Sequence, residues 1–385
     1  MRYLYALLCI YCFFVESTLC YAQSPDFIAM KVDLDSKPNV GIEVEKSIEY
    51  LFNALNKGNK NITLEEIQAL LDFTFSSASS GMHSIKERNG KGAFLRERVH
   101  APITHVIPYY FSNSIPLEVI HPAGVRSVIT LRGTEMIPQA TTSQFLNKTL
   151  SSITSYIGYD KEETTADLFT GASYTYAIKK MRILLPEYKG KRIAIIVNKQ
   201  LEPSTISTKT VTLGDDQNWN YIYSTLQGSL HASTGWVKSH IYDSAMIFLI
   251  VENPQDNTTE LFLFKWLRAG WLRINVVSSS HIYRGSKRVL YSINKVLSNP
   301  HVPSAQNIAK KYAELRKMDE NQLRVLLKEY SEKLSHIALT NPILKGNEWQ
   351  PFVADGVYAS TLNKAQLIAL LMKNYMKENI GVPIL

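Results

Sequence analysis

Every cysteine in this 385-residue sequence lies within the first 20 residues, at Cys9, Cys12 and Cys20. A chain that begins at residue 23 therefore has no disulfide, no thiolate metal site and no cysteine nucleophile. Its fold must rest on the burial of apolar side chains. The sequence can supply such a core, because 45% of the residues are hydrophobic and 20% are charged. That composition argues against wholesale disorder.

The N-terminus has the pattern of an export signal. Arg2 supplies a positive charge, residues 3–15 form an apolar run, and residues 20–22 offer small side chains for cleavage before Gln23. The run is shorter than the ~20 residues that a membrane-spanning helix needs, and no longer apolar stretch follows. We therefore predict a signal peptide at 1–22 and no transmembrane helix after it. A cysteine-free exported chain favours a bacterial protein, either periplasmic or secreted.

Charge is distributed unevenly along the chain. Residues 1–264 hold 24 Lys and Arg against 26 Asp and Glu, whereas residues 265–385 hold 18 against 8. No acidic residue occurs between Leu261 and Ala313. A basic surface concentrates anionic partners through its summed field, and the clustering favours such a site. The lack of a compact Lys/Arg run favours the alternative, a solvated face that keeps the protein soluble.

The basic stretch is our candidate for binding an anionic partner. For an exported protein that partner is an anionic lipid, lipopolysaccharide, an acidic glycan or an acidic protein, and nucleic acid is not expected. The predicted contacts are the seven cations that open the stretch: Lys265, Arg268, Arg273, Arg284, Lys287, Arg288 and Lys295.

Two tryptophans, Trp266 and Trp271, are interleaved with these cations in the segment FKWLRAGWLRIN. Trp and Arg are enriched where proteins bury anchors at interfaces, and Trp beside cations also suits a membrane–water boundary. Stacking of Arg on Trp inside the fold would produce the same composition. In a strand Trp266 and Arg268 would share a face, which favours a structural anchor and leaves an interface anchor as the second interpretation.

Hydrophobic periodicity changes character along the chain. Helical spacing at 42–55, followed by a helix capped by Thr63 with Glu66, predicts a helical hairpin. A β-rich region follows, and a strand hairpin comes after it at 245–252 and 259–266. In the β-rich region we predict one helix at 167–181 and strands at 103–111, 117–120, 125–132, 192–198 and 205–213.

Three capped helices are predicted to close the chain. They start after Ser304, at Asp319 with Gln322, and at Asn363 with Gln366, and Gly381 ends the last one. The order predicts an α+β fold with an N-terminal helical hairpin, a central mixed or antiparallel β-rich region and C-terminal helices. With residues 214–216 as a linker, the predicted parts are the signal peptide 1–22, the helical hairpin 23–72, a β-rich α+β domain 73–213, a β-hairpin region with the basic stretch 217–300, and a C-terminal helical region 301–385.

Familiar catalytic and cofactor motifs are missing. The sequence has no G-x-S-x-G elbow, no phosphate-binding loop, no H-E-x-x-H and no G-x-G-x-x-G, so we expect no cofactor and no metal. The loop between the first two helices resembles the loop of an EF-hand only in its asparagines. It has no aspartate before Glu65, and a calcium site needs several carboxylates, so a plain helical hairpin is the preferred interpretation.

Histidines leave an enzymatic alternative open. His100, His105 and His121 could bind zinc if the fold brings them together, but no Asp or Glu lies close enough in sequence to orient them. A hydrolytic triad could also be drawn from Ser233, Asp243 and His281, although only geometry would make it credible.

The sequence thus favours a non-enzymatic exported protein of the bacterial envelope that binds an anionic partner or surface through its basic C-terminal part. The alternative is a hydrolase that acts on envelope glycan, lipid or peptide with a histidine-based site. A third hypothesis, an aromatic-lined glycan binder, rests on 21 tyrosines and five tryptophans, most of which we expect in strands and the core.

Overall fold

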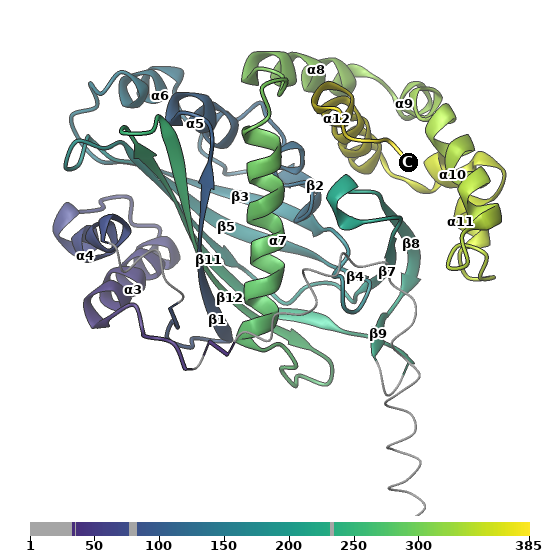
Figure 1. The fold of residues 1–385 in the computed structure, drawn as a ribbon, viewed down its shortest axis with the longest axis horizontal. Helices are drawn as coiled ribbons and strands as arrows, with labels where there is room; N and C mark the ends of the chain where they lie inside the picture. Colours follow the sequence, from purple (N-terminus) through teal and green to yellow (C-terminus); the bar gives the residue numbers. More distant parts are fainter. Residues whose placement is uncertain (1–32, 35, 77–82, 232–234) are drawn as a thin grey trace, which may run out of the picture.

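The computed structural model describes residues 33–34, 36–76, 83–231 and 235–385. The predicted signal peptide and its three cysteines lie outside the described residues. Figure 1 shows a large sheet with a helical hairpin on one side, a long helix across the other side, and an arc of helices at the C-terminal end. The predicted α+β layout, with helices at both ends and strands between them, is confirmed.

The main sheet is antiparallel throughout, and its strand order is β1-β12-β11-β6-β5-β3-β2. The predicted hairpin at 245–266 is confirmed as β11 and β12, each longer than expected. The seven strands are β1 (Lys91–Val99), β2 (Val125–Thr130), β3 (Thr154–Thr164), β5 (Thr175–Leu184), β6 (Ile193–Gln200), β11 (His240–Asn253) and β12 (Thr258–Gly270).

Both faces of the main sheet are covered, because side chains alternate between the two faces along each strand. Phe264 on β12 belongs to a core shared with the helices α3 (Ile42–Lys57) and α4 (Leu64–Phe75). Its neighbour Leu263 belongs to a second core on the opposite face. Strands buried on two sides read as continuous apolar runs, which is why β11 and β12 were recognisable in the sequence.

The predicted N-terminal helical hairpin is confirmed, but its predicted capping box is not. Gly58 ends α3 in the left-handed conformation, as expected for a C-cap. Thr63 occupies the N-cap position of α4 without a side-chain hydrogen bond to the helix. Its backbone N–H instead donates to the hydroxyl of Tyr50, at 3.3 Å. The tertiary contact between the helices therefore replaces the local cap.

A long helix that the sequence analysis did not predict crosses the other face of the sheet. Helix α7 (Ser279–Leu297) is capped by Ser278, whose hydroxyl accepts from the backbone N–H of His281. It packs against β1 and β12 (Figure 1). Its sequence is poor in strong helix formers and contains Gly285, so burial of its apolar side outweighs weak intrinsic propensity.

Two small sheets lie beside α7 (Figure 1). The first contains β4 (Ala172–Ser173), β7 (Thr208–Thr212) and β8 (Tyr221–Gln227), and the second contains β9 (Ser229–His231) and β10 (Gly235–Val237). The linker predicted at 214–216 joins two strands that pair with each other, β7 and β8. Strand β6 precedes the predicted linker and pairs with β11, which follows it. The main sheet therefore contains strands from both of the regions that the prediction separated, 73–213 and 217–300.

The predicted C-terminal helices are present, with caps at Ser304, at Asp319 with Gln322, and at Asn363 with Gln366. The helix expected after Asp319 is divided at Leu327 into two. The last helix packs against β2. The elements are α8 (Ala305–Lys317), α9 (Glu320–Leu326), α10 (Lys328–Thr340), α11 (Gln350–Val353), the 3₁₀ segment η4 (Ala354–Thr361) and α12 (Lys364–Ile380). Across all the described residues, we find no helix with the length and apolar character that spanning a bilayer requires.

Three predictions of secondary structure were wrong. Residues 103–111 form a helix, α5 (Ile103–Phe111), and residues 117–119 form the 3₁₀ turn η2 (Leu117–Val119). Residues 103–111 were predicted as a strand because they are rich in β-branched and aromatic side chains. The buried residues at 103, 106, 107 and 110 have helical spacing, and that pattern should have been given more weight. The helix predicted at 167–181 is replaced by β4 and the first part of β5, because β5 pairs with both β3 and β6. A further helix, α6 (Gln139–Leu146), was not predicted.

Candidate ligand-binding site

A cavity of about 730 Å³ lies between α7 and the main sheet. It exists because α7 packs against β1 and β12 at one edge of the sheet, while α12 packs against β2 at the other edge. The small sheets complete the wall over the middle strands. The volume falls within the ~300–1,000 Å³ typical of small-molecule sites. Most of its lining is apolar and includes Ile178, Met246, Phe248, Leu263, Ile282 and Val289.

A group of polar side chains interrupts this apolar lining on the sheet side. We call it the polar cluster, and it comprises Glu162 (β3), Tyr176 (β5), Asn198 (β6), Ser244 (β11) and Lys265 (β12). Strand register forms two neighbourhoods along the cavity wall: Tyr176 pairs with Glu162, and a single residue of β11 separates Asn198 from Lys265. The charge of Lys265 acts on Glu162 and connects the two. The ammonium of Lys265 donates to the hydroxyl of Ser244 at 2.7 Å.

Burial controls the electrostatics of this cluster. Burial, together with the negative charge of Asp160, raises the pKa of Glu162 to about 7, against the opposing attraction of Lys265 and Lys180. Burial also lowers the pKa of Lys265, and the charges of Glu162 and Asp243 oppose that effect. Burial therefore favours the protonated form of the Glu162 carboxyl group, beside a lysine that faces the cavity.

The polar cluster also has unused hydrogen-bonding capacity. The side-chain oxygen of Asn198 is buried and accepts no hydrogen bond in the described part of the chain. The ammonium of Lys265 carries three donors and uses one on Ser244. Buried polar groups are normally paired, so these atoms are suited to a ligand that brings its own polar end.

The seven cations predicted to form one binding surface have separate roles. Lys265 lines the cavity, whereas Lys287 on α7 is exposed. Arg288 forms an ion pair with Asp216 at 3.3 Å and donates to the carbonyl of Ala123 at 2.9 Å.

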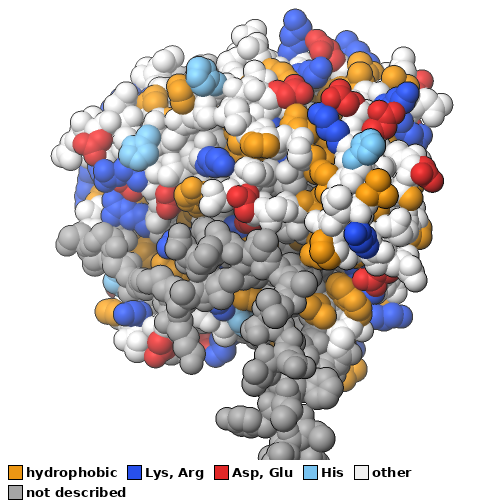
Figure 2. Space-filling view, turned by 45° about the vertical axis from the view of Figure 1, so that its right-hand side comes forward, with side chains coloured by type: hydrophobic (Ala, Val, Ile, Leu, Met, Phe, Trp, Pro, Cys, Tyr) orange, Lys and Arg blue, Asp and Glu red, His pale blue; other side chains and the backbone are white. Residues whose placement is uncertain are grey.

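The remaining cations are also held in place by neighbours. Lys295 donates to the carbonyl of Gln217 at 3.0 Å, and the guanidinium of Arg284 lies 4.6 Å from the ring centre of Phe169. Arg268 lies near the end of β12 and Arg273 lies in the loop that follows; the guanidinium of Arg268 donates to the carbonyl of Arg273 at 3.1 Å. Figure 2, which brings forward the side carrying α9 to α11, shows cations mixed with carboxylates rather than a surface of one sign.

The two candidate tryptophans lie in different environments. Trp266 is only 2% exposed, packs edge-on against Phe52 of α3, and donates its indole N–H to the carbonyl of Lys86 at 2.8 Å. The guanidinium above its ring is that of Arg88, so the predicted stacking with Arg268 is wrong. Trp266 therefore attaches the N-terminal helices to the sheet and cannot reach an outside partner. Trp271 lines the cavity.

The candidate histidines lie in different environments. No three His, Cys, Asp or Glu side chains there form a group that could hold a metal. His121 is buried against Tyr110, and burial lowers its pKa to about 3. His281 lines the cavity, but its ring nitrogen is paired with the backbone N–H of Ser278. Ser233 of the conceivable triad lies outside the described residues.

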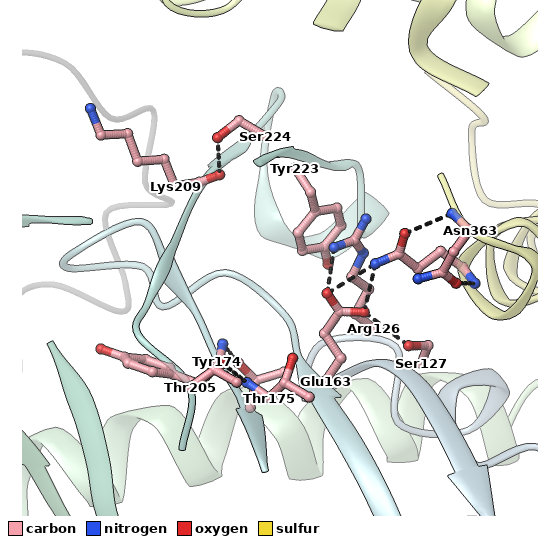
Figure 3. Close-up of polar contacts among 12 residues, drawn as sticks. Arg126, Ser127, Glu163, Tyr174, Thr175, Thr205, Lys209, Tyr223, Ser224 and Asn363 are labelled. Atoms are coloured by element: carbon pink, nitrogen blue, oxygen red, sulfur yellow. Dashed lines mark hydrogen bonds and ion pairs between the residues drawn. The ribbon is translucent and has the colours of Figure 1, made fainter. Parts of the chain in front are cut away.

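A second polar group, shown in Figure 3, has a structural explanation. Glu163 on β3 accepts from Arg126 at 2.6 Å, from Ser127 at 3.0 Å and from Gln366 of α12 at 3.1 Å. The guanidinium of Arg126 also lies 3.8 Å from the ring centre of Tyr223. These contacts attach α12 to the edge of the main sheet. Both carboxylate oxygens of Glu163 already accept hydrogen bonds from protein groups, so we assign this group a structural role.

Sequence reasoning found Lys265 by its charge and missed most of the polar cluster. Glu162 and Tyr176 lie in strands that were not predicted, and Asn198 ends the strand predicted at 192–198. The sequence did contain one usable signal for the cluster: Asn198 is a polar residue directly after the apolar run of a buried strand. Comparison with protein-family models gives no match for this chain, and comparison with curated proteins gives none either.

Proposed function

We propose that this protein is a non-enzymatic, exported binding protein of the bacterial envelope that takes an amphipathic anionic small molecule into the cavity beneath α7. The observation that carries the proposal is the polar cluster, with its cation Lys265, at one wall of an otherwise apolar space of about 730 Å³. A carboxylate- or phosphate-bearing lipid matches both features. Its chain would be buried among the apolar side chains and its head would accept from Lys265.

Glu162 supports an anionic head rather than opposing it. Its pKa near 7 allows the carboxyl group to take up a proton when a second negative charge arrives, because the added charge raises that pKa further. A protonated Glu162 can then donate to the head, while the orphaned oxygen of Asn198 accepts from a hydroxyl or amide of the ligand.

The decisive experiment measures binding of dansyl-undecanoic acid to the chain from residue 23 onward, by fluorescence titration. We expect Lys265→Met to lower the affinity about 10- to 100-fold, since a charge-assisted hydrogen bond contributes about 1.5–3 kcal/mol. Lys287→Met, an exposed cation of α7 outside the cavity lining, is the matched control and should bind as the wild type does. Unchanged affinity in Lys265→Met would overturn the proposal.

A cavity-filling variant checks the location of the ligand. Met246→Trp adds bulk to a lining side chain and should abolish binding while the far-ultraviolet circular dichroism is preserved. Recovering a lysophospholipid intact after incubation supports a binding protein. Recovery of cleaved products would favour the hydrolase that the sequence analysis kept as its alternative.

Export makes a separate and simple prediction. When the gene is expressed with its own first 22 residues in a Gram-negative host, mass spectrometry of the periplasmic fraction should find a chain that starts at Gln23. A full-length protein confined to the cytoplasm would contradict the exported part of the proposal.

A further inference from the structure

The loop that connects β12 to α7 exposes large apolar side chains beside the cavity. Leu272 is 83% exposed, Ile274 is 58% exposed and Val276 is 43% exposed. The same loop lines the cavity through Gly270, Trp271, Val276 and Val277. Val276 is both part of the lining and open to solvent, so the loop forms part of the cavity rim.

This exposure is built by a defined turn. The backbone N–H of Ile274 donates to the carbonyl of Trp271 at 2.9 Å, and both residues between them have positive φ, 50° at Leu272 and 62° at Arg273. Two successive residues in this region normally favour Asn and Gly, because a β-carbon is strained there. The backbone of Leu272 is therefore in a strained conformation, and its side chain is not buried within the fold to offset that cost.

Neighbouring residues hold the strained turn in place. The backbone N–H of Arg273 donates to the hydroxyl of Tyr242 at 2.7 Å, and its carbonyl accepts from Arg268 at 3.1 Å. At the base of the loop, a β-carbon on Gly270 would lie 2.2 Å from the carbonyl oxygen of Ile274, so this close approach requires glycine. The apolar tip is thus presented by a pre-organised loop.

Two arginines lie in or contact the exposed loop, and a third lines the same cavity. Arg273 is exposed, Arg268 supports the turn, and Arg284 lies over Phe169, another exposed side chain of the cavity lining. Within the described part of the chain, none of these three arginines forms an ion pair with a carboxylate within 4 Å. The nearest acidic residue in the sheet register is Asp243, opposite Arg268 on β11.

We infer that the loop from Trp271 to Val276 docks on an anionic lipid surface, with Leu272 and Ile274 entering the acyl boundary and Arg273 contacting the head groups. Apolar side chains combined with adjacent cations suit such an interface, and an acidic protein would have less use for the protruding leucine. Docking there would place the cavity rim against the bilayer. The role in ligand transfer rests on the proposed function, whereas the docking itself does not.

The test is co-sedimentation of the chain from residue 23 onward with vesicles of phosphatidylcholine, with and without phosphatidylglycerol. We expect binding to the vesicles that contain phosphatidylglycerol, and weaker binding as salt rises because exposed charges are screened. Leu272→Asp should lower vesicle affinity about tenfold or more. Leu339→Asp on α10, where the leucine is 69% exposed, is the matched control and should leave vesicle binding unchanged.

A second variant separates docking from structural effects. Leu272→Gly removes the apolar tip and relieves the strain, so it should raise the melting temperature while it weakens vesicle binding. Neither Leu272 nor Arg273 lines the cavity, so Leu272→Gly and Arg273→Glu should bind the dansyl fatty acid in solution as the wild type does.

The outcomes distinguish this inference from the proposed function. Wild-type protein that ignores vesicles containing phosphatidylglycerol, or loop variants that bind them unchanged, would overturn the docking surface even if the fatty acid binds. Vesicle binding that depends on Leu272, in a protein that takes no fatty acid, would retain the docking surface and remove the proposed cavity ligand.

Discussion

The two faces of the main sheet are built from alternate residues of the same strands, yet they differ in kind. The face toward α3 and α4 is filled by aromatic side chains, with Phe94 and Phe264 at 4.7 Å between ring centres and Trp266 against Phe52. The face toward α7 contains a cavity lined in part by ionisable groups. The first face is closely packed, and the second leaves a cavity between the sheet and α7.

The difference is sharpest between neighbours on β12. Trp266 lies in a closed core, whereas Lys265, one position earlier, faces the cavity. A well-packed core would exclude an ammonium group, because burial of an unpaired charge is costly. On the other face, the ammonium of Lys179 lies at the margin of the core and donates to the carbonyl of Asn56 on α3 at 3.2 Å, whereas Lys265 faces an open cavity.

The largest expected effect concerns packing. Leu249→Ala removes a fully buried side chain from the core with α3 and α4, and should lower the free energy of unfolding by about 4 kcal/mol. Leu263→Ala makes the same change on the cavity face and should cost about 2 kcal/mol, because that side chain already borders empty space. Urea denaturation measures both, and equal losses would mean that the cavity face is packed as tightly as the other.

Next in size is the contrast between cations on α7. Arg288→Met breaks the ion pair with Asp216, removes the guanidinium donor of the Ala166 carbonyl and removes one of the two donors of the Ala123 carbonyl, so it should lower the free energy of unfolding by about 3 kcal/mol. Lys287→Met changes an exposed neighbour and should alter stability by less than about 0.5 kcal/mol. If thermal unfolding finds the two variants alike, Arg288 does not hold α7 to the loops beneath it.

The smallest effect is a pH dependence of ligand binding at the cavity. Glu162, with a pKa of about 7, should be protonated when an anionic ligand binds, so affinity for the dansyl fatty acid should be about tenfold higher at pH 6 than at pH 8. Because its folded-state pKa lies above the ordinary value of 4.5, the stability contributed by its proton is complete below that value and is lost as pH rises through about 7. Glu162→Gln should flatten the affinity profile, whereas the stability profile should keep a contribution from Glu118, whose pKa burial also raises to about 7. An unchanged affinity profile in that variant would assign the titration to another group.

Local signals predicted much of the fold. The capping boxes of Asp319 with Gln322 and of Asn363 with Gln366 depend on residues three positions apart, and both were found from the sequence. Predictions failed where distant pairing decides the outcome. Residues 167–181 were predicted as a helix, but residues from 175 onward form β5, which pairs with both β3 and β6. Helix α7 has weak intrinsic helix propensity, and burial against the sheet stabilises it.

The sequence by itself determined the α+β layout, the hairpin of β11 and β12 and the concentration of late cations, because alternation, caps and charge are properties of neighbouring residues. Only the tertiary structure decided that Trp266 closes a core, that Arg288 is an internal tie and that Lys265 faces a cavity. The physical reason is distance along the chain. Glu162, Lys265 and α7 come together through strand pairing and helix packing. The pattern of neighbouring residues does not indicate which part of a sheet a helix from elsewhere in the chain will leave uncovered.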